Sequence, residues 1–293
     1  MEGEPALRHF DSPAAVAARA AYHTATGERS SYDEGLALLL PLLQGGLDIV
    51  DDWGCNSPHL SLGALRRAGL RPLVRGFDVL SEDEIMSALP DGFDLSGFTY
   101  HKVEPRGRRP PVEANTADAA FFNNVVFRAQ DVSPTGAKDL IYKGMYGVKL
   151  GGVAVWGSNY PDHAKVRHWV PWGAQMYASR ISRTRTVGIR PPAYSMFFPQ
   201  LAKLLSATAG LEILTVQERK SNVEITELDA FLRAIQYEVL RTDLPEHAHA
   251  AYQEGLEIYA KRLMEGAKRR GQTLRDISHT GKVVVRKIGE VAC

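Results

Sequence analysis

The sequence predicts an α/β protein in which helices flank a mostly parallel sheet. Its 293 residues include 44% hydrophobic and 24% charged residues, a composition typical of globular domains. From residue 47 onward, short apolar runs alternate with helical patterns, as expected for parallel strands joined by crossover helices. Residues 221–280 have a helical pattern and precede a final apolar run, so a helical insertion is predicted before the last strand.

Two helices are expected at the start of the chain. Within residues 1–30, Ser12 and Pro13 supply an N-cap and a first-turn proline for an alanine-rich helix. A second helix is predicted to begin at Ser31, where Glu34 completes a capping box. Pro41 is expected to kink the last turn of this second helix.

Strands and helices then alternate. One crossover helix follows residue 59, and Ser81 with Glu84 forms a capping box for the next. Further helices are expected at residues 133–146 and 198–207, and two amphipathic stripes in the insertion predict a helical hairpin. The strands are predicted at residues 47–50, 73–77, 98–103, 119–122, 153–156, 211–216 and 282–288.

Composition and charge exclude several classes of protein. No run of about 18 apolar residues is present, which excludes a transmembrane helix. Residues 1–11 lack the apolar stretch of a secretory signal, so a cytoplasmic protein is expected. Two cysteines cannot form a disulfide framework or a cysteine-rich zinc site, and no other metal site is predicted. A net charge of +1 argues against nucleic acid as the main partner.

The most informative stretch is IVDDWGCNSPH, which begins at Ile49. It places a carboxylate, Asp52, near the end of a strand, followed by a turn that contains Gly54 and then by a helix start. Glycine allows a ligand to approach the backbone closely, and a helix start offers free N–H groups. Asp78 ends the next strand, where a carboxylate can accept both hydroxyls of a ribose. The pattern therefore predicts a nucleotide-like ligand.

This stretch resembles the first motif of the class I S-adenosylmethionine-dependent methyltransferases. Asp52 matches the acid of that motif, Gly54 matches its first glycine and Cys55 follows, whereas Asn56 and Pro58 occupy its other two glycine positions. The segments ADAAFFNNVVF, LGGVAVWGSNYPD and GKVVVRKIG resemble later motifs of the family, in the expected order. The resemblance implies a Rossmann-like sheet of seven strands, the last antiparallel, in a core formed by residues 31–220 and 281–293.

The resemblance also implies how the site is arranged. S-adenosylmethionine would lie with its amino-acid end near Asp52, Gly54, Cys55 and Asn56 and with its ribose on Asp78, next to Val79. Its methyl group would point toward the ends of the fourth and fifth strands. There, Asn123 would contact the cofactor, and His163 would act as the general base. The predicted acceptor-binding residues are Asn124, Asn159 and Tyr160.

Methyl transfer to an oxygen or nitrogen of a small molecule is therefore the expected function. A nicotinamide-dinucleotide site is the main rival for such a turn, but its G-x-G-x-x-G spacing is absent. Two alternatives remain open: a methyltransferase-like partner subunit without catalysis, and a nucleic-acid methyltransferase. Asp52 and Asp78 could also serve only as cap and turn residues, and His163 could be a surface residue. Association into a homodimer is left open.

Overall fold

The computed structural model of the protein describes residues 30–43, 45–87, 89–104, 112–123, 125, 135–159, 166–183, 198–235 and 246–292. The helix predicted near the start of the chain lies outside these residues. The chain divides into two compact units. A sheet unit comprises Ser30–Pro161, Pro192–Arg219 and His279–Cys293. A helical unit comprises Met1–Arg29, Asp162–Pro191 and Lys220–Ser278.

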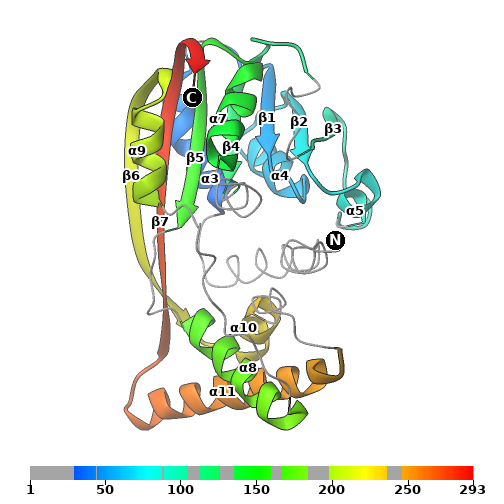
Figure 1. Ribbon diagram of the computed structural model, residues 1–293, viewed down its shortest axis with the longest axis vertical. Coiled ribbons are helices and arrows are strands. Elements are labelled where there is room, and N and C mark those ends of the chain that lie inside the picture. Colours follow the sequence, from blue (N-terminus) through cyan, green and yellow to red (C-terminus); the bar gives the residue numbers. More distant parts are fainter. Residues whose placement is uncertain are drawn as a thin grey trace. The chain divides into compact units, whose positions relative to one another are not determined.

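In the described residues, the sheet has seven strands in the order β3-β2-β1-β4-β5-β7-β6 (Figure 1). The first five in this order are parallel, and β7 is antiparallel to β5. The predicted seven-stranded, mostly parallel sheet with an antiparallel last strand is therefore confirmed. The strands are β1 (Ile49–Trp53), β2 (Leu73–Asp78), β3 (Phe98–Lys102), β4 (Ala117–Asn123), β5 (Val148–Asn159), β6 (Ala209–Ile225) and β7 (Leu274–Ala292).

Several strands extend beyond their predicted ends. β1 runs to Trp53, so that Asp52 lies within the strand, and β6 and β7 are 17 and 19 residues long. The β5–β7 ladder explains part of this difference, because it continues from the Val153–Arg286 pair to the Asn159–Thr280 pair. Backbone pairing extends a strand through polar residues that break the apolar pattern on which the prediction depended.

The helices of the sheet unit agree with the sequence pattern except at one cap. Ser81 and Glu84 form the predicted capping box. The helix expected to be capped by Ser31 is instead capped by Ser30, whose hydroxyl accepts a hydrogen bond from the Asp33 N–H, because the Ser31 hydroxyl is bonded to Asn123. These helices are α3 (Ser31–Leu39), the 3₁₀ turn η1 (Leu40–Leu42), α4 (His59–Arg67), α5 (Glu82–Met86), α7 (Gly136–Gly147) and α9 (Phe198–Ser206).

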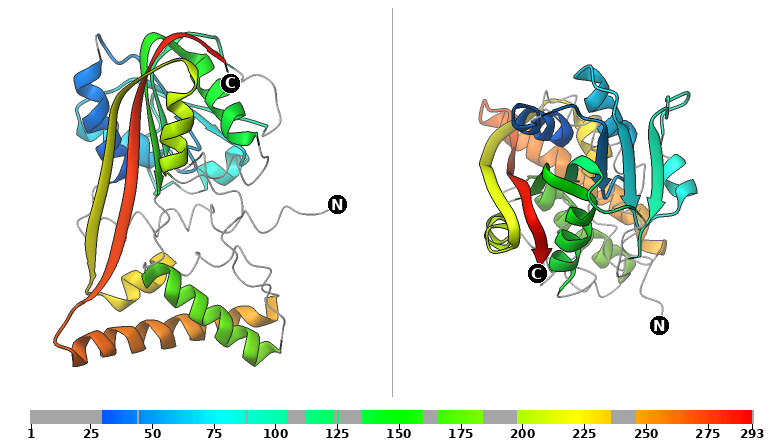
Figure 2. Two further views of the ribbon diagram at one scale, coloured as in Figure 1. Left: turned by 60° about the vertical axis from the view of Figure 1, so that its left-hand side comes forward. Right: turned by 90° about the horizontal axis from the view of Figure 1, so that it is seen from above.

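Helices cover both faces of the sheet. α3 and α4 pack Leu36 and Leu65 on one face, against strand residues that include Val50. α7 and α9 pack Ile141 and Leu201 on the opposite face (Figure 2). A strand alternates its side chains between two faces, so each strand contributes to both cores.

Aromatic rings form a continuous stack on the α7 side of the sheet. Trp53 stacks on Phe77 with ring centroids 4.4 Å apart and on Phe122 at 6.1 Å. Phe122 stacks on Trp156 at 3.5 Å, and Phe77 stacks on His101 at 5.2 Å. All of these neighbours are also direct register partners in the sheet. The stacked rings therefore connect five adjacent strands near their carboxyl ends.

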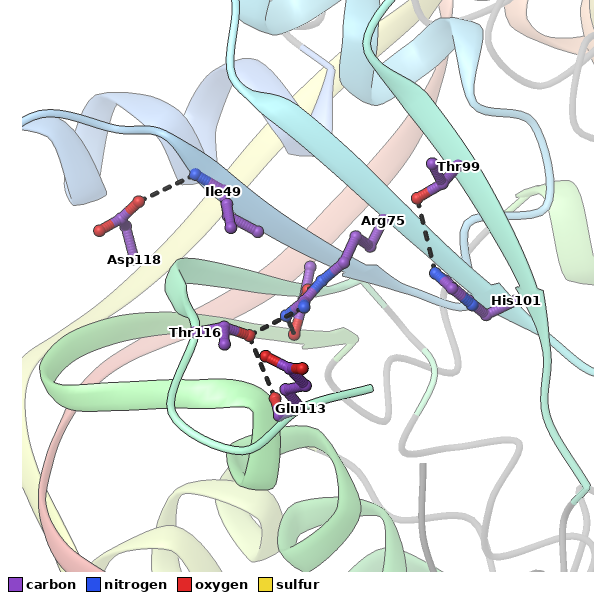
Figure 3. A network of polar contacts seen from close by, with 8 residues as sticks. Ile49, Arg75, Thr99, His101, Glu113, Thr116 and Asp118 are labelled. Atoms are coloured by element: carbon purple, nitrogen blue, oxygen red, sulfur yellow. Dashed lines mark hydrogen bonds and ion pairs between the residues drawn. The ribbon is translucent and has the colours of Figure 1, made fainter. Parts of the chain in front are cut away.

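A buried ion pair connects β1 with β2 on the α7 side of the sheet. Arg75 donates through Nε to Asp51 Oδ1 at 2.7 Å. Its Nη1 donates to Thr116 Oγ1 at 2.8 Å (Figure 3). Burial raises the pKa of Asp51, and the Arg75 guanidinium opposes this shift. Gly147 leaves space for the pair, since a Cβ there would lie 2.6 Å from Asp51 Oδ2. This network connects β1, β2 and the residue that precedes β4.

The helical unit has a core of its own. α8 (Val166–Ser182), α10 (Leu228–Ile235), the 3₁₀ turn η2 (Glu246–Ala248) and α11 (His249–Arg269) are its described helices. Val170, Phe231, Tyr252 and Leu256 are among the residues buried between them. α10 and α11 lie where the two amphipathic stripes are predicted. α8 belongs to the same unit.

Gly144 provides a test of the aromatic stack. A Cβ at this position would overlap the ring of Phe122, which is fully buried against Trp156 and has no room to move. We expect Gly144→Ala to lower the free energy of unfolding by about 1–3 kcal/mol, measured by urea denaturation. Helix propensity alone would give the opposite sign, a gain of up to about 1 kcal/mol.

Gly63→Ala in α4 is the matched control. The added Cβ would lie 3.2 Å from the flexible end of Arg67, so this helical substitution should leave stability unchanged or raise it slightly. If Gly144→Ala were as stable as this control, Phe122 would not be held rigidly in the stack.

Candidate functional site

The turn between β1 and α4 is fastened to the end of β2. Gly54 has φ +69°, and a Cβ there would lie 2.9 Å from Val125, so the position requires glycine. The N–H groups of Gly54 and Cys55 both donate to the Phe77 carbonyl, at 2.7 and 3.2 Å. Asn56, at the second glycine position of the motif, adopts φ +36°, which asparagine tolerates better than most residues. This departure from the motif therefore preserves the turn.

Pro58, at the third glycine position, is the N-cap of α4, with φ −61°. This angle is the one that the proline ring imposes, so the residue suits the start of a helix. Both departures from the motif are thus compatible with a strand–turn–helix unit.

Asp52 is a fully buried carboxylate beside this turn. Its Oδ1 accepts a hydrogen bond from the Tyr32 hydroxyl at 2.8 Å. Its Oδ2 has no hydrogen-bond partner among the described residues. The Ser61 hydroxyl donates to the Pro58 carbonyl at 3.3 Å, but it lies close enough to Asp52 to lower the pKa of this carboxyl. Burial raises the pKa of Asp52 to about 6, with a further contribution from the charge of Asp78. An oxygen in this state is suited to a cationic ligand.

Asp78, at the end of β2, links two loops. Its Oδ2 accepts a hydrogen bond from the Asn56 N–H at 2.9 Å, and its Oδ1 accepts one from the Val79 N–H at 2.7 Å and a longer one from the Leu80 N–H at 3.3 Å. The Val79 side chain is 52% exposed. Asp78 therefore holds the turn after β1 against the end of β2, with an exposed apolar surface beside it.

A second polar cluster lies near the carboxyl ends of β4 and β5, beside the middle of β7. Lys282 Nζ donates to Ser31 Oγ at 2.6 Å, and Ser31 Oγ donates to Asn123 Oδ1 at 2.8 Å. Burial lowers the pKa of Lys282 to about 8, and the charge of Arg219 adds to the effect. Gly157 faces all three side chains, since a Cβ there would lie 3.3 Å from Lys282 Nζ and 3.4 Å from Asn123 Oδ1.

The two clusters meet at Tyr32. Burial and the Asp52 carboxylate raise the pKa of the Tyr32 phenol, and the neighbouring Asn123 amide acts in the opposite direction. Polar groups therefore continue along the α3 side of the sheet from the end of β1 to β7.

The structure brings most of the predicted site residues together. The ends of β1, β2 and β4 carry the seven residues predicted to bind the cofactor: Asp52, Gly54, Cys55, Asn56, Asp78, Val79 and Asn123. Cys55 is 2% exposed and burial raises the pKa of its thiol, so its side chain acts as an apolar filler.

Four other predicted residues lack a described side chain. Asn124, Tyr160 and His163 lie outside the described residues. The backbone of Asn159 ends β5 opposite Thr280, but its side chain is not described.

Sequence reasoning missed four residues of the site. Tyr32 and Ser31 occur in a stretch that the pattern assigns only to a helix start. Gly157 and Lys282 are direct register partners across β5 and β7, more than a hundred residues apart in the sequence. One feature of the sequence could have indicated Lys282: it is a charged residue at the start of the apolar run KVVVRKI, which is typical of a strand buried on both faces.

Neither a metal centre nor a membrane span is found in the described part of the chain. No group of three or more His, Cys, Asp or Glu side chains there is arranged to hold a metal ion. No helix in these ranges is both long enough and apolar enough to cross a membrane.

Comparisons with known proteins identify the fold. No protein-family model matches the chain, and no curated protein matches its sequence. A candidate methyltransferase from Bacillus halodurans C-125 superposes with a TM-score of 0.50 at 13% identity, over 87% of this chain and 99% of that one. A candidate type II methyltransferase from Anaeromyxobacter dehalogenans gives a TM-score of 0.48 at 15% identity, over 87% and 96%.

The Bacillus structure and the strand order agree on one fold. The chain has the Rossmann-like fold of the class I methyltransferases, so the resemblance seen in the sequence is confirmed at the level of the fold.

Asp52 should make stability depend on pH. Because its pKa in the folded state, about 6, exceeds the ordinary value of 3.8, the folded protein binds the proton more tightly than the unfolded chain. Stability is therefore lost as the pH rises from about 4 to 6, by about 3 kcal/mol in total. We expect Asp52→Asn to be more stable than the wild type at pH 7 and equally stable near pH 4, as measured by urea denaturation.

Asp83→Asn, at an exposed position in α5, serves as the control and should show no such difference. A stability difference between Asp52→Asn and the wild type that is the same at pH 4 and pH 7 would show that the Asp52 carboxylate titrates normally.

Proposed function

We propose that this protein is an S-adenosylmethionine-dependent methyltransferase that methylates an oxygen or nitrogen atom of a small-molecule acceptor. The observation that carries the proposal is the buried Asp52 carboxylate, whose Oδ2 lacks a hydrogen-bond partner among the described residues. It stands beside a turn that requires glycine, at the carboxyl end of β1 in a fold of this class. A buried, unpaired carboxylate oxygen is costly unless a ligand uses it.

The described side chains fit the parts of this cofactor. Asp52, with Gly54, Cys55 and Asn56, would hold the cationic amino-acid end. Asp78 would accept the ribose hydroxyls, and the exposed Val79 would offer an apolar surface for the base. When bound, the cofactor supplies an electrophilic methyl group, and the contribution of these residues is to bind and orient it.

The same residues argue against a dinucleotide. Asp52 and Asp78 place two carboxylates at the ends of adjacent strands, and the charge of Asp78 already raises the pKa of Asp52. A pyrophosphate would add negative charge to this region, whereas the ammonium of an amino-acid moiety would compensate it.

The balance of charge favours a small acceptor. With a net charge of +1, the chain lacks the basic excess that nucleic-acid enzymes use to hold phosphates. Asn124, Asn159 and Tyr160 remain the residues predicted to bind the acceptor, and His163 remains a predicted base. A cytoplasmic location belongs to the same proposal.

One observation favours a second candidate, a partner subunit without catalysis. The Asp78 carboxylate already accepts hydrogen bonds from the backbone N–H groups of Asn56, Val79 and Leu80. These bonds give Asp78 a structural role that requires no cofactor. Direct measurement of cofactor binding separates the two candidates.

Calorimetry with S-adenosylhomocysteine tests the proposal. We expect the purified protein to bind this demethylated product and not NAD. Asp78→Ala should weaken binding by about 10- to 100-fold, since hydrogen bonds to a charged group contribute about 1.5–3 kcal/mol. Asp83→Ala, at an exposed position five residues further on, should bind like the wild type.

Binding of neither ligand would favour the partner-subunit candidate. Tight binding of NAD without binding of S-adenosylhomocysteine would replace the methyltransferase assignment by a dehydrogenase one.

A further inference from the structure

Apart from the cofactor contact predicted for Asn123, the cluster formed by Ser31, Asn123 and Lys282 is not used by the cofactor-holding role proposed for Asp52 and Asp78. Two hydrogen bonds connect its members, from Lys282 Nζ to Ser31 Oγ at 2.6 Å and from Ser31 Oγ to Asn123 Oδ1 at 2.8 Å. Asn123 pairs in register with Gly157, and Gly157 pairs with Lys282, so the cluster spans three adjacent strands. Glycine at 157 keeps side-chain atoms out of the space that the polar groups share.

The position of the cluster relates it to methyl transfer. If β1 and β2 hold the two halves of the cofactor through Asp52 and Asp78, the transferred methyl group faces the next strands, β4 and β5. Asn123 and Gly157 are the register partners near the carboxyl ends of those two strands. The cluster therefore lies on the side of the sheet where an acceptor would meet the methyl group.

The Lys282 amine is in an electrostatic environment that favours loss of its proton. Its residue is 4% exposed, and burial lowers its pKa to about 8. Arg219 on β6 adds to the effect, although its charge is partly compensated by an ion pair with Glu34 on α3. Elsewhere on β7, the His279 ring contacts Glu218 at 2.5 Å and Arg286 forms an ion pair with Glu212 at 3.3 Å.

We propose that Ser31 and Lys282 accept the proton that the methyl acceptor loses during transfer, and that Asn123 accepts the Ser31 hydrogen for as long as Lys282 is an ammonium group. This inference rests on the function proposed above. The acceptor's oxygen or nitrogen forms a bond to the methyl carbon, and the carbon–sulfur bond breaks with its electron pair left on sulfur. The O–H or N–H proton of the acceptor passes to Ser31 Oγ, while the proton of Ser31 passes to Lys282 Nζ.

The directions of the two hydrogen bonds explain why the proposed proton transfer uses Ser31, Asn123 and Lys282. While Lys282 is an ammonium group, it can only donate, so the single hydrogen of Ser31 is directed to Asn123 Oδ1. Once Lys282 is neutral, its lone pair can accept that hydrogen. The half-buried Ser31 then connects the buried Lys282 amine with the acceptor.

Lysine resonances provide a test that requires no knowledge of the acceptor. Protein labelled with carbon-13 at the lysine ε position is titrated between pH 6 and 10, alone and saturated with S-adenosylmethionine or S-adenosylhomocysteine. The two ligands differ by the positive charge on sulfur and the methyl group. We expect the pKa of Lys282 to be about one unit lower with S-adenosylmethionine than with S-adenosylhomocysteine, since a like charge disfavours the ammonium form.

Lys287 is the matched control. It is another buried lysine of β7, 6% exposed, but its Nζ donates to the Met145 and Val148 carbonyls, away from the cluster. Its resonance should respond equally to the two ligands. Lys282→Met and Lys287→Met assign the two signals, and if Lys282→Met does not fold, the signal displaced by Ser31→Ala identifies Lys282.

Each outcome decides the proposal. A Lys282 pKa above 10 in the free protein, or the same pKa in both complexes, would overturn the proton-accepting role and leave the methyltransferase assignment intact. Failure of both ligands to bind would refute the methyltransferase assignment and this inference together.

Discussion

The stack of aromatic rings across β3, β2, β1, β4 and β5 is the constraint on which the rest of the site depends. Trp53, Phe77, Phe122 and Trp156 are register partners, and their rings are in contact from one strand to the next. A shift of one residue in any of these strands would move a large ring from the α7 face of the sheet to the other face. The stack therefore holds the ends of the strands in one alignment.

The residues adjacent to these rings carry the chemistry. Asp52 precedes Trp53, Asp78 follows Phe77 and Asn123 follows Phe122, so alternation along the strands places them on the face opposite the rings. Gly157 follows Trp156 in the same way. The helix α3 covers that face and adds Ser31 and Tyr32 to the polar groups. A hydrophobic stack on one side of the sheet thus aligns a polar site on the other.

This arrangement carries a cost in stability. Burial raises the pKa of Asp52 and lowers the pKa of Lys282, so it favours the neutral form of both side chains. The folded state would therefore be more stable at neutral pH without their charges. The two hydrophobic cores of the sheet unit offset this cost. Buried charges that weaken the fold are typical of sites where a ligand or a proton transfer uses them.

The sequence by itself determined the alternation of strands and helices, the antiparallel last strand through its resemblance to a family, and the turn with Asp52 and Gly54. Apart from the antiparallel strand, these features depend on local patterns, as does the capping box of Ser81 and Glu84. Only the tertiary structure decided that Ser31 bonds to Asn123 while Ser30 caps α3, and that Lys282 faces Gly157. The physical reason is that strand register and burial are set by partners distant in the chain, to which no local pattern refers.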